Sequence, residues 1–101
     1  MEKTVIQKRL YKALRVLPEA KQVRRISLFG SQLRGTARED SDVDLLIEFN
    51  KPISMFALVR MERELSDVLG ARVDLVTPNS LSKYFRLDVL KEAEPLFEVS
   101  V

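Results

Sequence analysis

Hydrophobic residues recur along this 101-residue chain with two different periods. In three segments they return every three or four positions, which places them on one side of an α-helix and leaves charged residues on the other. Serine, asparagine, glycine and proline stand where such helices begin and end. The pattern predicts helices from Glu2 to Leu17, from a cap at Ser54 to Gly70, and from a cap at Asn79 or Ser80 to the residue before Pro95.

Three other segments are runs of aliphatic and β-branched residues bounded by turn residues, as in buried strands. The middle run is almost entirely apolar after its first acids, which is typical of a central strand. A short helix, Ser31–Leu33 or slightly longer, is expected after the first strand because Gly35 ends it. The alternating tail from Leu96 to Val101 predicts an edge strand. The three main strands are Val23–Phe29, Asp42–Phe49 and Arg72–Thr77.

The order of these elements is α-β-α-β-α-β-α, which predicts an α/β (α+β) fold with helices packed on a small mixed sheet. The helix between the second and third strands forms a right-handed crossover, so these two strands should be parallel. The first two strands should be antiparallel, because only then does the turn at Gly30 and Ser31 reach Asp42. The length suits a single domain that spans residues 1–101.

Three aspartates lie in or beside these strands. Asp42 and Asp44 are two positions apart, so their side chains leave the same face with Cβ atoms about 6.5 to 7 Å apart. Asp74 lies inside the third strand, where it can stand beside Asp44. Charges in apolar strands are costly unless they are compensated. Three carboxylates on one face predict a divalent cation site, and Mg²⁺ is preferred because it shares phosphate oxygens.

The turn at Gly30 and Ser31 supplies a second chemical feature. It follows a strand and precedes a helix, so its backbone N–H groups and its hydroxyl can bind an anion. A metal site beside an anion site indicates nucleotide chemistry. The competing interpretation is structural, with the acids exposed to solvent or paired with arginines. The candidate arginines are Arg24, Arg25 and Arg72.

Composition restricts this chemistry further. The chain has no cysteine and no histidine, so any metal must bind oxygen. No apolar run reaches the ~20 residues of a membrane span, and the first residues lack a secretion signal, which together predict a cytoplasmic protein. Basic residues are concentrated in residues 1–38. No base-reading motif accompanies them, so direct nucleic-acid binding is not expected.

The spacing of these motifs resembles the signature of the DNA polymerase β-like nucleotidyltransferase superfamily. Ten residues separate Gly30-Ser31 from the pair Asp42 and Asp44, and the segment Val73–Val76 follows with the third acid. The length is similar to that of the minimal nucleotidyltransferase (MNT) branch, which includes the MntA-like antitoxins. The closing sequence LKEAEPLFE is also similar to the ends of those proteins.

The resemblance implies a role for each candidate residue. Asp42 and Asp44 would hold two Mg²⁺ ions that bridge the triphosphate of ATP, and Asp74 would complete the metal site for the attacking hydroxyl as ligand or base. Gly30 and Ser31 would hold the β- and γ-phosphates.

Two arginines of the intervening loop are candidates for charge neutralisation. Arg34 would neutralise the leaving pyrophosphate. Arg38 is a second candidate for that role, but a flexible solvated loop is the favoured account of its charge.

The resemblance also implies a reaction and a partner. The expected activity is transfer of AMP from ATP to a tyrosine hydroxyl of a HEPN-family toxin, which silences the toxin. The chain is too short to carry an acceptor-binding domain, so the acceptor comes from a partner in a hetero-oligomer, with a homodimer as a further expected assembly. The second hypothesis is a non-catalytic antitoxin, or binding module, that neutralises its partner by direct contact through the first helix.

Overall fold

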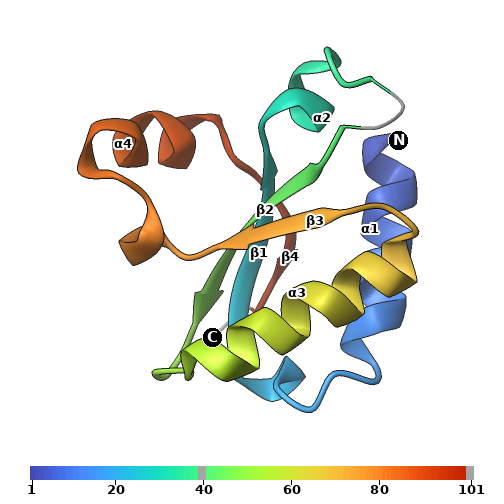
Figure 1. The fold of residues 1–101 in the computed structure, drawn as a ribbon, viewed down its shortest axis with the longest axis vertical. Helices are drawn as coiled ribbons and strands as arrows, with labels where there is room; N and C mark the ends of the chain where they lie inside the picture. The colour runs from blue at the N-terminus through green and yellow to red at the C-terminus, as the bar shows by residue number, and fades with distance from the viewer. Residues whose placement is uncertain (39–40, 100–101) are drawn as a thin grey trace.

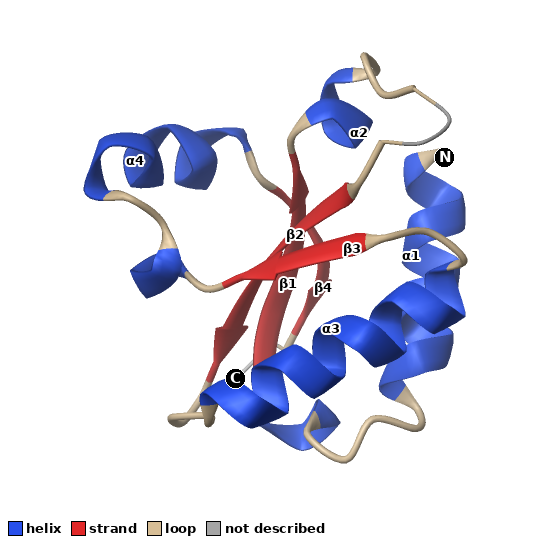
Figure 2. Cartoon of the chain, in the orientation of Figure 1, coloured by secondary structure: helices blue, strands red, loops and turns tan. Residues whose placement is uncertain are grey.

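The computed structural model describes residues 1–38 and 41–99 of the chain. A four-stranded sheet runs through the centre of the molecule, and helices flank it on both sides (Figures 1 and 2). In chain order the elements are α1 (Lys3–Leu14), the 3₁₀ turn η1 (Ala20–Gln22), β1 (Val23–Phe29), α2 (Ser31–Arg34), β2 (Val43–Phe49), α3 (Met55–Leu69), β3 (Val73–Val76), the 3₁₀ turn η2 (Pro78–Ser80), α4 (Lys83–Glu92) and β4 (Glu94–Glu98).

The sheet is mixed, as the sequence predicts. Its strand order is β3-β2-β1-β4, so β2 has a neighbour on each side and is a central strand. β2 pairs with β3 in parallel and with β1 in antiparallel fashion, which confirms both expected orientations. β4 pairs antiparallel with β1 and forms the far edge. The expected edge strand therefore exists, but it spans Glu94–Glu98 rather than beginning at Leu96, and residues 100 and 101 of the predicted strand lie outside the described residues.

α1 and α3 cover one face of the sheet. Their apolar stripes are buried together with alternate residues of the strands. On β2 the residues in this core are Val43, Leu45 and Ile47, so the residues between them, beginning with Asp44, face the other side. The buried side chains that α1 and α3 contribute are Ile6, Leu10, Ala13, Met61, Leu65 and Leu69.

The packing of α1 buries most of the apolar surface that the contact hypothesis requires. The apolar stripe of the first helix lies in the core, so the surface open to a partner consists of its polar and basic residues together with the exposed Tyr11. The helix also ends at Leu14, three residues before the predicted end at Leu17. Leu17 is nevertheless buried, because the chain after α1 still packs on the core.

α3 has the predicted ends. The hydroxyl of Ser54 accepts a hydrogen bond from the N–H of Ala57 at 3.1 Å, as expected of an N-cap, and Gly70 ends the helix with a φ of 71°. The short α2 after Gly30 is also confirmed.

α4 differs from the prediction at its start and in its packing. Thr77 and Ser80 form a reciprocal capping box that closes η2, so neither predicted cap starts α4, and Ser82 caps it instead. α4 contributes no buried side chain, and Tyr84 and Phe85 are 79% and 64% exposed. Figure 1 shows α4 standing apart from α1 and α3, across the sheet from them.

Within residues 1–38 and 41–99, no helix has both the length and the apolar composition that a bilayer crossing requires.

Candidate active site

Asp44 and Asp74 stand side by side on the open face of the sheet. They are partners in the parallel register of β2 and β3, whose backbones lie about 4.8 Å apart. The neighbours of Asp74 in β3, Val73 and Leu75, are buried on the core side, so Asp74 is exposed on the other. The predicted juxtaposition of these two acids is therefore confirmed by the fold.

Asp42 directly precedes β2. Its Oδ2 lies 3.9 Å from Nε of Arg72, whose side chain is 84% exposed, so this ion pair is long and screened by solvent. Burial raises the pKa of Asp44, and the negative charges of Asp74 and Asp42 raise it further. The three carboxylates thus share one electrostatic environment, which the exposed Arg72 does not neutralise.

The turn after β1 lies against the carboxylate of Asp44. Gly30 is buried and has a φ of 78°, and a Cβ atom built on it would lie 2.1 Å from Oδ2 of Asp44. Only a residue without a side chain allows this approach. The antiparallel register pairs Phe29 with Asp44, which explains why the turn and the acid meet.

A hollow of about 430 Å³ opens beside this contact. Phe29 of β1, Gly30 of the turn, Arg34 of α2 and Asp44 of β2 line one part of it. Residues of α4, together with Leu81 two residues before α4, line the rest. Ser31, the first residue of α2, is half-buried next to Gly30. The second group of lining residues consists of Leu81, Phe85, Asp88, Val89 and Glu92.

Glu92 contacts the turn directly, which the sequence did not predict. Its Oε1 accepts a hydrogen bond from the N–H of Gly30 at 3.3 Å and lies 3.6 Å from Nε of Arg34. The Arg34 side chain is 60% exposed. Glu92 belongs to the closing segment LKEAEPLFE, whose resemblance to the ends of MNT proteins is the only sequence signal that points to it.

Two side chains of α3 hold the outer edge of β3, and the sequence did not predict these either. Oε2 of Glu62 accepts a hydrogen bond from the N–H of Leu75 at 2.8 Å, and Oγ of Ser66 accepts one from the N–H of Val73 at 2.9 Å. The two bonds fix the backbone on both sides of Asp74. The i, i+4 spacing of Glu62 and Ser66 next to the buried stripe of α3 is the signal that could have indicated them.

Arg38 lies in the loop before Asp42. Its backbone N–H donates to Oγ of Ser41 at 2.7 Å, and its carbonyl accepts from the N–H of Ser41 at 3.0 Å. Its side chain is exposed. These bonds join Arg38 to Ser41, which lies two residues before β2.

The donor set suits Mg²⁺, because every candidate ligand is a carboxylate oxygen. Among the residues described, no three acids are already grouped closely enough to hold a metal ion. The like charges that raise the pKa of Asp44 are the feature that a divalent cation would relieve. The chemistry of Asp42, Asp44 and Asp74 therefore fits a divalent cation, and its binding would bring the three carboxylates closer together.

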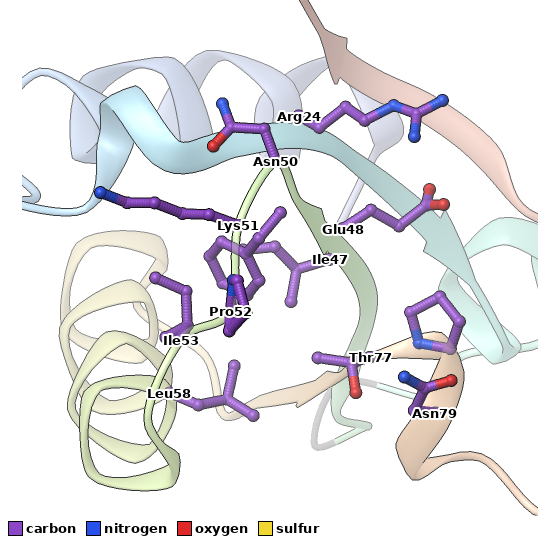
Figure 3. Close-up of a pocket in the computed structure, with 12 residues that line it drawn as sticks. Arg24, Ile47, Glu48, Asn50, Lys51, Pro52, Ile53, Leu58, Thr77 and Asn79 are labelled. Atoms are coloured by element: carbon purple, nitrogen blue, oxygen red, sulfur yellow. The ribbon is translucent and has the colours of Figure 1, made fainter.

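A second hollow, of about 580 Å³, lies at the other end of β2 (Figure 3). It is formed by the last residues of β2, the loop to α3 and η2, and Figure 3 shows Ile47, Leu58 and Thr77 around it. Asp44 stands near the start of β2, three residues before Ile47 in the strand, so this hollow does not contain the carboxylates.

Comparison with known proteins gives a consistent result. Residues 10–96 match the family model for the nucleotidyltransferase domain. The protein adenylyltransferase MntA of Thermococcus cleftensis is 46% identical over 70 residues, which cover 69% of this chain and 71% of that protein. A proposed protein adenylyltransferase of Methanocaldococcus jannaschii is 44% identical over 72 residues, which cover 71% and 74% of the two chains.

Solved structures share the fold. A proposed minimal nucleotidyltransferase is 38% identical, with a TM-score of 0.74 and coverage of 94% of this chain and 96% of that one. A chain of a toxin–antitoxin crystal structure with AMP-PNP is 26% identical, with a TM-score of 0.77 and coverage of 92% and 73%. The complex of a tri-AMPylated HEPN toxin of Shewanella oneidensis with an MNT antitoxin contains the same fold at 23% identity and a TM-score of 0.69, with coverage of 95% and 72%.

Proposed function

Because the chain belongs to the nucleotidyltransferase domain family, we propose that it transfers AMP from ATP to a tyrosine hydroxyl of a HEPN-family toxin and acts as the antitoxin in the cytoplasm. The observation that carries this proposal is the register of β2 and β3, which brings Asp44 next to Asp74 beside the turn at Gly30. The names of the T. cleftensis relative and of the AMP-PNP complex support the same reaction and the same kind of partner.

Asp42, Asp44 and Asp74 are the proposed metal ligands and catalytic residues. When bound, two Mg²⁺ ions would supply charge stabilisation for the triphosphate and its leaving group. In the transfer itself, the tyrosine oxygen attacks the α-phosphorus, the new O–P bond forms, and the bond to pyrophosphate breaks. Asp74 lies at the exposed edge of the site, where it can receive the hydroxyl proton or orient the hydroxyl.

Gly30, Ser31 and Arg34 are the proposed phosphate-binding residues. The N–H of Gly30 donates a hydrogen bond to the carboxylate of Glu92, which supports the proposal that this N–H can also donate to a phosphate. Arg34 borders the same hollow as Asp44 and carries an exposed guanidinium, so its side chain can reach the pyrophosphate. Arg38 has no assigned role in this proposal.

The experiment is a transfer assay with the chain, Mg·ATP and a HEPN-family protein, with the product of the neighbouring gene as the first one to be tested. Mass spectrometry should detect a gain of one or more AMP groups on a tyrosine of the HEPN protein. The matched control is the double variant Asp42→Asn and Asp44→Asn, which should leave the partner unmodified. A partner that is neutralised without any gain in mass would support the contact hypothesis instead.

A further inference from the structure

The carboxylate of Glu92 contacts the two groups that the proposed function assigns to phosphate binding. Its Oε1 accepts from the N–H of Gly30 at 3.3 Å and lies 3.6 Å from Nε of Arg34. A backbone donor and a guanidinium are the partners that phosphate oxygens also take. One carboxylate therefore already uses both proposed phosphate contacts.

We propose that Glu92 holds the phosphate position while the site is free of nucleotide, and that the triphosphate of ATP displaces it and releases α4 from the turn. The inference rests on the proposed function. A carboxylate and a phosphate are both negative, so they cannot share the N–H of Gly30 and the guanidinium of Arg34 without strong repulsion. Glu92 consequently lowers the affinity of the site for nucleotide.

The attachment of α4 explains why displacement of one side chain would free a helix. α4 buries no side chain in the core and makes few close backbone contacts with the other elements. Near its start, Arg86 donates to the carbonyls of Pro78 and Leu81 at 2.8 and 3.1 Å. Within residues 1–38 and 41–99, Glu92 is the polar side chain that ties α4 to β1 and α2.

The surroundings of Glu92 favour its departure once a nucleotide arrives. Burial, and then the charges of Asp74 and Asp42, raise the pKa of Asp44, and the charge of Glu92 adds to them. Glu92 lines the same hollow as Asp44 and Asp88, so three carboxylates and one guanidinium, that of Arg34, border it within the described part of the chain. A triphosphate at Gly30 would add negative charge at the same place, while α4, with its exposed Phe85, has room to move into solvent.

The test compares nucleotide binding by the whole chain and two variants. Isothermal titration calorimetry with Mg·AMP-PNP should show that Glu92→Gln binds about threefold to tenfold more tightly than the wild type, because the competing contact joins partly exposed groups. Asp88→Asn is the matched control. Asp88 lines the same hollow, and its substitution removes the same charge. The hydrogen bond to Gly30 and the ion pair with Arg34 belong to Glu92 and not to Asp88, so the nucleotide affinity of Asp88→Asn should change less.

Hydrogen exchange supplies the second measurement. Backbone amides of residues 86–92 should exchange faster when the wild type is saturated with Mg·AMP-PNP, and equally fast without nucleotide in Glu92→Ala, which has no side-chain oxygen to accept from the N–H of Gly30. Equal or weaker binding by Glu92→Gln, an equal gain in Asp88→Asn, or slower exchange in α4 on binding would each overturn the inference and leave the proposed function standing. A folded wild type that binds no Mg·AMP-PNP would overturn both.

Discussion

Asp44 on β2 and Asp74 on β3 are register partners in adjacent parallel strands, so two like charges face each other on the open side of the sheet. Burial raises the pKa of Asp44, and the charges of Asp74 and Asp42 raise it further. An acid with a higher pKa in the folded state binds its proton more tightly there. The free energy of unfolding therefore decreases as pH rises from the unfolded pKa of about 3.9 through the raised folded value.

Replacing Asp44 with asparagine should consequently stabilise the metal-free protein at pH 7. We expect a gain of up to about 1 kcal/mol, limited by solvent screening, and no gain at a pH below the unfolded value. Urea unfolding of both proteins at pH 7 and pH 3 measures the difference. Asp67→Asn, at an exposed position on α3, is the control and should change stability little. A lower stability of Asp44→Asn at pH 7 would contradict the repulsion.

Magnesium should relieve the same repulsion in the wild type. At free Mg²⁺ of about five times Kd, binding adds about 1 kcal/mol, which raises Tm by about 4 to 8 °C for a chain of this size. EDTA should reverse the shift. The double variant Asp42→Asn and Asp44→Asn should show no shift, and scanning calorimetry in NaCl of matched ionic strength separates binding from salt effects. An equal shift in the double variant would place the ion elsewhere.

Gly30→Ala tests the close approach of the turn to Asp44. The new Cβ would lie 2.1 Å from Oδ2 of Asp44, so the carboxylate must move away from its position. We expect AMP transfer to fall by about 100-fold or more, because a displacement of about 1 Å costs that much. Gly35→Ala is the control for a positive φ without the contact, since Gly35 has a φ of 75° but no atom within 4 Å of the built Cβ.

Gly35→Ala should lose about 1 to 2 kcal/mol of stability, because alanine is strained in the left-handed helical conformation of Gly35. Gly30→Ala should lose more, because the φ of 78° and ψ of −156° at Gly30 lie in a region that only glycine adopts readily. Urea unfolding and the initial rate of AMP incorporation, measured on the same preparations, separate strain from loss of function. The interpretation requires that Gly30→Ala lose far more activity than Gly35→Ala under conditions in which unfolding curves show both variants to be folded. Similar activity in the two variants would show that the contact with Asp44 does not matter.

Glu62 should support Asp74 through the edge of β3. Glu62→Ala leaves the N–H of Leu75 without its acceptor, and we expect a loss of about 1 to 3 kcal/mol in the free energy of unfolding together with slower AMP transfer. Glu62→Gln keeps an oxygen acceptor and should retain most of both. Urea unfolding and the transfer assay provide the two readouts. If the alanine and glutamine variants behave alike, charge rather than the hydrogen bond is responsible.

The sheet and its acids could be predicted because their determinants are local. Alternation along β2 assigns Asp44 to the face opposite Val43 and Leu45, and the length of the α3 crossover requires parallel pairing with β3. These two facts bring Asp74 to Asp44 without any tertiary information. The predicted start of α4 was wrong because Thr77 and Ser80 form a reciprocal capping box that closes the separate turn η2. Ser80 is therefore not available to cap α4.

The amino-acid sequence alone thus determined the order of the strands along the chain, the face that each aspartate occupies and the oxygen-only chemistry of the site. Only the tertiary structure decided that α4 stays outside the core, that Glu62 holds the edge of β3, and that Glu92 reaches Gly30. Periodicity reports which side of an element a residue occupies. It does not report which distant backbone group a flexible acidic side chain reaches, because that depends on how separate elements pack together in space.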